Sequence, residues 1–252
     1  MVCLVLLIRI KMETKSNKTI VLECYRKIIR DLDLSLIDDY IREDYIQHSP
    51  TVKDGKAGLL EMLHFLKSLP QPKEHGPSPI IRTIAEDDLV AVHLDVRFMG
   101  KRAAVVDLFR LQDGKIAEHW DASKMQPENQ DGLVTMTNGT TVINEKADSA
   151  VNKRLIDEFY QERFGKNDTR YLAEDYLDHD PDGGLLKQSS YDVKVHRLVA
   201  EGDFVVAQCE LIGETVSYAN YDIFRIANGK IAEHWCVEQQ VPQTMAHNNG
   251  MF

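Results

Sequence analysis

The chain has 252 residues, with 30 lysines and arginines against 40 aspartates and glutamates, and a formal net charge of −10 at pH 7. Nucleic acids and anionic membranes bind basic patches, so this acidic balance, without a dense Lys/Arg cluster, argues against both as partners. The four cysteines are scattered without a C-x-x-C pair, which argues against a disulfide scaffold or structural zinc and predicts a reducing, cytoplasmic location.

The first ten residues, MVCLVLLIRI, are apolar. They are too few to span a bilayer, which takes about 20 residues. They also lack the basic start and the small-residue cleavage site of a signal sequence. We interpret residues 1–12 as an N-terminal extension, from upstream translation or as an extra strand, with Met12 as the effective start. A poor signal sequence is the alternative.

The next segments predict two helices and a short connection between them. Residues 18–33 have apolar side chains at helical spacing, which predicts an amphipathic helix. Residues 43–50, EDYIQHSP, predict a short helix or turn that leads into a strand stopped by Pro50. Residues 57–69 predict a second helix, which ends at the proline that follows.

The region after these helices is rich in valine, isoleucine, phenylalanine and leucine. Residues 78–100 and 103–126 predict two antiparallel hairpins, with turns at EDD and QDGK. Residues 128–148 are polar and rich in turn formers, which predicts a linker. Helices followed by a strand meander indicate an α+β fold.

The sequence GKIAEHW occurs twice, at residues 114–120 and 229–235, an offset of 115. Upstream, YIREDYIQHSP at residues 40–50 matches YLAEDYLDHDP at residues 171–181, an offset of 131. The second copy is therefore 16 residues shorter, and the missing part is the region of the second predicted helix. A repeat of this length indicates a duplicated domain rather than a solenoid unit.

We therefore predict two tandem α+β domains, the second also opening with an amphipathic helix. The boundaries that we assign are 1–12 for the extension, 13–127 for the first domain, 128–148 for the linker and 149–252 for the second, shortened domain.

The QDGK turn decides which side chains share a face of the hairpin. Gly114 sits where a three-residue loop needs a left-handed residue, and such a loop places residues of equal parity on one face. One face is then expected to carry Asp107, Phe109, Ala117, His119 and Asp121. The other face is expected to carry Val106, Leu108, Arg110, Ile116, Glu118 and Trp120.

The second of these faces is mostly apolar and needs a cover. The equivalent face of the other copy is one candidate for that cover. Arg110 and Glu118 are placed to form a cross-strand ion pair, as are Arg225 and Glu233 in the second copy; anion binding is the alternative.

The first face carries two carboxylates and an imidazole among apolar residues, which indicates the lining of a pocket. Carboxyl groups in a poorly hydrated pocket repel each other and lose solvation, so the pKa of one of them rises. Such a carboxyl group can exchange a proton near neutral pH. The alternative is two solvated carboxylates on an exposed sheet.

The blocks YIQHSP, VDLFRLQDGKIAEHWDASKMQP and HNNGMF resemble SnoaL-like polyketide cyclases, part of the superfamily of nuclear transport factor 2 and ketosteroid isomerase. The resemblance covers residues 15–252. It implies two cone-shaped NTF2-like domains, each a curved antiparallel sheet packed on N-terminal helices, which pair as an intrachain pseudo-dimer. It also implies that no metal or cofactor is used. One aspartate would take and return a proton during an intramolecular aldol closure of a small apolar carbonyl compound.

The resemblance places this acid–base residue at Asp121, just after the HW pair, with Asp107 as its partner. His48 and His93 would approach the same cavity, and Tyr25 would donate a hydrogen bond to a developing oxyanion. His119 and Phe109 complete the expected substrate pocket. Packed or capping histidines and a core tyrosine are the alternatives for His48, His93 and Tyr25.

The second copy departs from this pattern. It keeps Asp222, His179 and Tyr160, but it has Cys236 in place of the acid–base residue and Gln208 in place of His93. We expect Cys236 to be a buried inert thiol. Asp180 lies close to the position of the base in ketosteroid isomerases, which leaves an isomerase-type reaction in this copy open.

The main hypothesis is a cyclase or aldol-type enzyme with an active first copy and a structural second copy. The rival is a non-catalytic protein that binds a small apolar ligand, or a scaffold. A nuclear transport adaptor has only the fold in its favour. We expect neither nucleic acid nor a membrane as partner, and we leave association beyond the intrachain pair open.

Overall fold

The computed structural model describes residues 15–71, 76–98, 100–128, 134–162, 169–182, 184–186 and 191–252. The proposed N-terminal extension, residues 1–12, lies outside these ranges. Among the described residues, no helix has both the length and the apolar character needed to cross a membrane.

The first copy opens with helical segments and continues into strands. Its elements are α1 (Asn17–Cys24), the π-helix η1 (Tyr25–Arg30), the 3-10 helix η2 (Leu34–Leu36), α2 (Ile37–Tyr40), β1 (Ile41–Gln47), α3 (Gly55–Ser68), β2 (Ile80–Glu86), β3 (Leu89–Phe98), β4 (Lys101–Gln112) and β5 (Lys115–Met125). Ser16 caps α1 by accepting a hydrogen bond from the backbone of Thr19, which fixes where this helix begins.

The second copy repeats this order in a shorter form. Its elements are α4 (Ser149–Glu162), the 3-10 helix η3 (Thr169–Tyr171), β6 (Leu172–Asp178), the 3-10 helix η4 (Gly184–Leu186), β7 (Asp192–Glu201), β8 (Phe204–Ile212), β9 (Ser217–Ala227) and β10 (Lys230–Gln240). Where the first copy has α3, the described part of the second has only the short η4.

Each copy forms a five-stranded sheet, in the order β1-β5-β4-β3-β2 and β6-β10-β9-β8-β7. The α+β prediction is confirmed. The expectation of wholly antiparallel sheets is wrong, because β1 pairs with β5, and β6 with β10, in parallel. In each copy three strands, β2 to β4 or β7 to β9, lie between the two parallel strands in the chain, which supplies the long connection that a parallel pair requires.

The turn between β4 and β5 differs from the expected three-residue loop. It has two residues, Asp113 and Gly114, with φ angles of 52° and 75°, the pattern of a type I′ hairpin. Pairing then shifts between Arg110 opposite Glu118 and Leu111 opposite Ile116, so that Ala117 is an extra residue in the strand. Because of this bulge Ile116 lies on the helix-covered face, and its predicted face is wrong.

The two predicted cross-strand ion pairs are confirmed. Arg110 Nε donates to Glu118 Oε2 at 2.8 Å, and Arg225 Nε donates to Glu233 Oε1 at 2.5 Å. Both glutamates thus carry a charge that is paired within its own hairpin.

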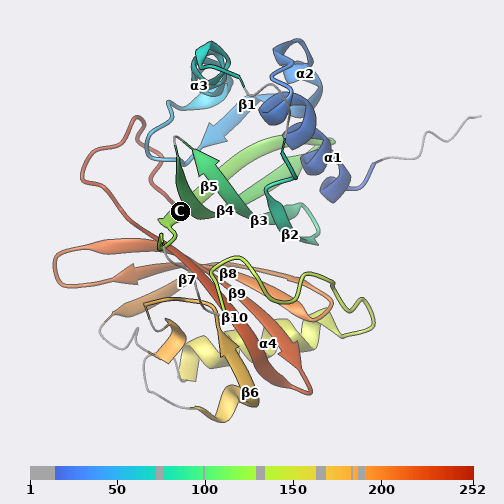
Figure 1. The fold of residues 1–252 in the computed structure, drawn as a ribbon, viewed down its shortest axis with the longest axis vertical. Helices are drawn as coiled ribbons and strands as arrows, with labels where there is room; N and C mark the ends of the chain where they lie inside the picture. Colours follow the sequence, from blue (N-terminus) through green and yellow to red (C-terminus); the bar gives the residue numbers. More distant parts are fainter. Residues whose placement is uncertain are drawn as a thin grey trace, which may run out of the picture.

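The two sheets lie against each other, with α1 to α3 outside the first and α4 outside the second (Figure 1). Buried apolar residues of both sheets meet between them, among them Val106, Leu108, Trp120, Val206, Ile223 and Trp235. The guanidinium of Arg82 stacks over Trp235, and that of Arg197 over Trp120, each at 3.9 Å from the ring centroid. The first sheet is therefore covered on one face by helices and on the other by the second sheet, which leaves the helix-covered face to form a site.

Candidate active site

The site lies between the first sheet and its helices. The antiparallel register of β4 and β5 sets Asp107 opposite Asp121 and Phe109 opposite His119. All four side chains line a cavity of about 210 Å³ beneath α1 and η1. The rest of its wall is mainly apolar and comes from the helices, β1, β5 and the segment after β1: Val21, Cys24, Ile28, Ile29, Ile41, Val52, Leu59, Met62 and Ile116.

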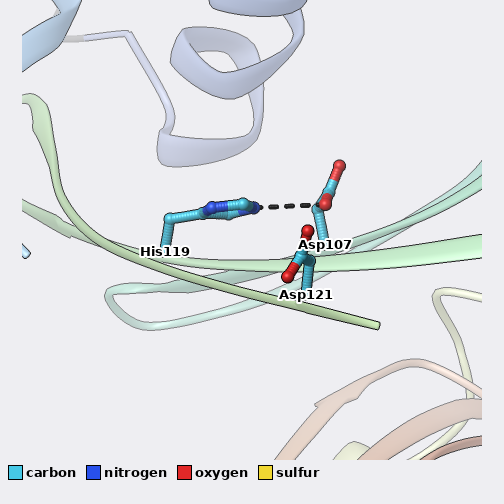
Figure 2. Close-up of side chains that lie close together, drawn as sticks. All are labelled: Asp107, His119 and Asp121. Carbon is cyan, nitrogen blue, oxygen red and sulfur yellow. Dashed lines mark hydrogen bonds and ion pairs between the residues drawn. The ribbon is translucent and has the colours of Figure 1, made fainter. Parts of the chain in front are cut away.

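A chain of hydrogen bonds runs along one wall of this cavity. Tyr25, at the start of η1, donates its hydroxyl hydrogen to Asp107 Oδ2. The other oxygen, Asp107 Oδ1, lies 3.1 Å from His119 Nε2 (Figure 2). The second ring nitrogen, His119 Nδ1, lies 2.9 Å from Gln47 Oε1.

The side chain of Gln47 fixes the tautomer of His119. Its Oε1 also accepts hydrogen bonds from the backbone N–H groups of His48 and Ser49, at 3.0 and 2.9 Å, and so must be the oxygen. His119 Nδ1 therefore carries a hydrogen and donates it to Gln47. Nε2 and the carboxylate of Asp107 then share one further proton between them.

The ionisation of His119 follows from this arrangement. Burial disfavours the imidazolium, but the hydrogen bond to Asp107 and the negative charges of Asp107 and Asp121 outweigh it and raise the pKa of His119. Burial also raises the pKa of Tyr25 well above its ordinary value, and the charge of Asp107 adds to the effect. The Tyr25 hydroxyl thus stays protonated and acts as a donor.

Asp121 stands beside this chain but outside it (Figure 2). Burial raises its pKa; the positive charge of His119 acts in the opposite direction, and the negative charge of Asp107 raises it further. Its Oδ1 atom is buried without a hydrogen-bond partner among the described residues. A carboxyl group of this kind is poised to exchange a proton with a molecule in the cavity.

The same three side chains are the candidate metal ligands. One ligand atom from each of Asp107, His119 and Asp121 falls within 4.8 Å of the others. However, His119 Nδ1 is bound to Gln47, and both oxygens of Asp107 are engaged by Tyr25 and His119. A metal ion would have to break these hydrogen bonds, so the donor set as arranged suits a shared proton better than a cation.

Two histidines expected at the cavity lie elsewhere. His48 stacks on Trp120 with ring centroids 4.9 Å apart, and its ring nitrogens face Gly250 O at 3.0 Å and Glu118 Oε1 at 2.9 Å. His93 Nδ1 accepts a hydrogen bond from Arg82, and burial lowers the pKa of this histidine to about 3. Neither side chain is among those that line the cavity.

The side chains that line the cavity near His48 belong to residues 45, 47 and 49 instead. Tyr45, Gln47 and Ser49 alternate with His48 and line the cavity together with Asp121. The signal that points to them is the parallel pairing of β1 with β5, in which Gln47 lies opposite His119. A sequence read without that pairing gives no reason to prefer Gln47 over its neighbour.

The second copy contains an equivalent hydrogen-bond chain. Tyr160 donates to Asp222 Oδ2 at 2.5 Å, Asp222 Oδ1 lies 2.9 Å from His234 Nε2, and His234 Nδ1 lies 3.1 Å from Asp178 Oδ1. Asp178 thus replaces Gln47. Burial disfavours the His234 imidazolium, but the charge of Asp178 and the hydrogen bonds to both carboxylates raise its pKa to about 10.

The space beside this second chain is filled. Asp222 and His234 have no exposed surface, and Cys236, at the position of Asp121, donates its thiol hydrogen to Asn220 Oδ1 at 3.1 Å. Phe159 precedes Tyr160 as Cys24 precedes Tyr25, and its ring packs on Tyr160 and Phe224 at centroid distances of 5.5 and 6.2 Å. A phenyl ring thus stands where the first copy has a small thiol.

The remaining candidates in the second copy lie outside this hydrogen-bond chain. His179 stacks on Trp235 with ring centroids 4.5 Å apart, and its Nε2 lies 3.3 Å from Glu233. Asp180 accepts a hydrogen bond from Lys124 Nζ at 2.9 Å. This ion pair leaves Asp180 in contact with a cation of the first copy.

Residues 22–119 match the model of a family described as the SnoaL-like domain. The first copy is a SnoaL-like domain. The match ends at His119, two residues before Asp121. No curated protein matches the chain at a significant level.

Several solved structures are similar to part of the chain. IdmH from Streptomyces antibioticus, a proposed polyketide cyclase, is 19% identical, with a TM-score of 0.36 over 44% of this chain and 93% of its own. AclR from Streptomyces galilaeus, a proposed hydroxylase, is 26% identical, with a TM-score of 0.35 over 44% of this chain and 80% of its own. An NTF-2 like protein of unknown function from Burkholderia xenovorans is 15% identical, with a TM-score of 0.37 over 46% and 88%.

Proposed function

We propose that the SnoaL-like first copy is a cofactor-independent enzyme of the cyclase or aldol type, in which Asp121 takes and returns a proton. One observation carries this proposal. Asp121 is a carboxyl group of raised pKa in a mainly apolar cavity of about 210 Å³, and one of its oxygens is buried without a hydrogen-bond partner among the described residues. The second copy has Cys236 at that position, and Asp222 opposite it has no exposed surface.

The cavity suits a small, mainly apolar carbonyl compound with an acidic C–H bond. The carboxylate of Asp121 removes the proton from the carbon next to the carbonyl, and the electron pair of that bond passes into the enolate. In an aldol closure, the enolate carbon bonds to a second carbonyl carbon of the same molecule. The new alkoxide then takes the proton back from Asp121, so the step balances without an added reagent.

The neighbouring pair of Asp107 and His119 is assigned a supporting role. The proton that they share places positive charge beside the cavity when it resides on His119, and this charge offsets the negative charge of an enolate. Tyr25 holds Asp107 in place, and its hydroxyl is committed to that carboxylate rather than to a substrate oxygen.

The second copy is assigned a structural role in an intrachain pseudo-dimer. The division into residues 13–127 and 149–252, joined by 128–148, forms part of this proposal. Reciprocal stacking of Arg82 on Trp235 and of Arg197 on Trp120 supports a two-fold relation between the copies. Buried thiols at Cys24 and Cys209 that form no disulfide among the described residues favour the cytoplasm as the location.

The test is proton exchange, because every reaction of this class begins by breaking a C–H bond. A panel of small β-dicarbonyl compounds is incubated with the protein in deuterium oxide, and deuterium incorporation is followed by NMR. We expect Asp121→Asn to slow the exchange by about 10²- to 10⁴-fold. The matched control, Cys236→Ala, should leave the rate unchanged. Equal rates for the wild type and Asp121→Asn would refute the assignment.

A second candidate is binding of a small apolar ligand without chemistry. It is favoured by the second copy, which keeps the Tyr–Asp–His chain in a buried core, as expected if this chain serves stability rather than chemistry. Native mass spectrometry of the purified protein separates the two. A bound ligand that is retained unchanged by both the wild type and Asp121→Asn, with no exchange in either, supports binding alone.

A further inference from the structure

Each copy is followed by a segment that crosses to the other copy. After β5, residues 134–142 reach the second sheet, where the backbone oxygen of Asn138 accepts a hydrogen bond from Trp235 Nε1 at 2.8 Å. The backbone N–H of Thr140 donates to Glu233 Oε2 at 3.0 Å. After β10, residues 246–250 reach the end of β1 in the first copy. The exchange of segments is therefore reciprocal.

The second crossing segment binds three backbone oxygens of the first copy. Asn249 Nδ2 donates to Gln47 O and His247 Nε2 to Ser49 O, each at 2.9 Å. The backbone N–H of Ala246 donates to Pro50 O at 2.8 Å. These bonds hold the main chain from Gln47 to Pro50 at successive points.

The ring of His247 is itself oriented by its own segment. Its Nδ1 accepts a hydrogen bond from the backbone N–H of Asn249 at 3.2 Å, which leaves Nε2 as the protonated nitrogen that faces Ser49 O. Gly250 extends the contact, because its backbone oxygen accepts a hydrogen bond from His48 Nδ1 at 3.0 Å. Residues 246–250 therefore bind residues 47–50 through both side-chain and main-chain hydrogen bonds.

The stretch that it holds is the one that positions the site. Gln47 Oε1 accepts the hydrogen bond that fixes the tautomer of His119. A hydrogen bond from the Ser49 side chain lowers the pKa of Asp121. Small displacements of residues 47–50 would therefore change the pKa values of His119 and Asp121.

We propose that His247 and Asn249 are positioning residues for the site of the first copy, so that the second copy completes the site through its own C-terminal segment. The effect on catalysis rests on the proposed function, whereas the effect on the two titrations does not. A second copy whose own core is filled is then retained because, without it, residues 47–50 lose the hydrogen bonds from the C-terminal segment.

The test compares two variants of the full chain by NMR without substrate. One carries His247→Ala together with Asn249→Ala. The other carries Asn138→Ala, in the crossing segment that serves the second copy. Imidazole nitrogen shifts of His119 and the carboxyl carbon shift of Asp121 are followed against pH. We expect the first variant to move at least one midpoint by about half a pH unit or more, and Asn138→Ala to move neither.

The outcomes distinguish a positioning role of His247 and Asn249 from a general loss of stability. Unchanged midpoints in the double variant overturn the proposal, as do equal shifts in Asn138→Ala. If the double variant does not fold, Asn249→Ala alone decides, because that side chain is exposed. Proton exchange that survives in Asp121→Asn refutes the proposed function but leaves these midpoints informative. Where exchange is observed, its pH profile should shift with them in the double variant.

Discussion

The two copies contain the same Tyr–Asp–His chain in different surroundings. In the first copy, Tyr25, Asp107 and His119 border a cavity. Asp121 stands beside them, with an oxygen that finds no hydrogen-bond partner in the part of the chain that the structure describes. In the second copy, the equivalent residues are sealed in a core with no exposed surface at Asp222 and His234. A Tyr–Asp–His chain therefore does not by itself mark a site; the cavity and the extra carboxyl group distinguish the first copy.

Besides Cys236 in place of Asp121, two further substitutions contribute to the difference. Phe159 fills space that Cys24 leaves open, and Asp178 adds a charge where Gln47 offers a neutral amide. The first change removes a binding volume. The second fixes the histidine as an imidazolium, because it lies between two carboxylates. The second copy thus has a buried network of charged groups, whereas in the first copy His119 and Asp107 share one proton.

Exchanging the residues at the filled position should give the largest change in stability. Phe159→Cys removes a ring from a packed aromatic core, and we expect it to lower the free energy of unfolding by about 3–5 kcal/mol. Cys24→Phe places a ring in an existing cavity, and we expect a change of less than about 1.5 kcal/mol, with loss of ligand binding. Urea denaturation and native mass spectrometry measure the two effects. Equal destabilisation by both variants would show that the copies are packed alike.

Much of the local structure could be predicted from the sequence. The helix over residues 57–69, the hairpins and the pairing of Arg110 with Glu118 follow from periodicity and turn chemistry, which act between neighbours in the chain. The same alternation placed Asp107, His119 and Asp121 on one face, and the structure brings them together. These features depend on contacts within a single hairpin or helix.

The rest depends on contacts between distant segments. The choice of Gln47 rather than His48 follows from the parallel pairing of β1 with β5, across about 70 residues of chain. The bulge at Ala117 displaces Ile116 without a sequence signal such as a glycine in the strand. His247 and Asn249 reach their partners from the far end of the chain. None of these relations has a local pattern by which to find it.

The charge difference between the copies predicts that the free energy of unfolding depends on pH, with an effect of intermediate size. The pKa of His234 is raised from about 6.5 in an unfolded chain to about 10 in the fold. Its contribution to stability is therefore fully present below about pH 6.5 and is lost as the pH rises through about 10. We expect this loss to be on the order of 3 kcal/mol, measured by urea denaturation across that range.

The control for this pH dependence is a reciprocal exchange. Asp178→Asn removes one carboxylate, so the pKa of His234 should fall and the decline in stability should begin at lower pH. Gln47→Glu adds a carboxylate beside His119 and should raise the pKa of that histidine further. A wild-type stability that stays flat between pH 7 and 10, with Asp178→Asn unchanged, would contradict the ion network.

The smallest effects concern the reciprocal stacking between the sheets. Arg82 and Arg197 lie at the same distance from their tryptophans, but Arg82 also donates to Asn138 O and Thr140 O, at 2.5 and 2.7 Å. Lysine lacks the planar fork that makes these contacts. We expect Arg197→Lys to lower the free energy of unfolding by about 1 kcal/mol and Arg82→Lys by about 2 kcal/mol. Urea denaturation of both variants isolates the difference, since the stacking geometry is shared. A smaller loss for Arg82→Lys would show that the segment after β5 adds nothing to the contact between the copies.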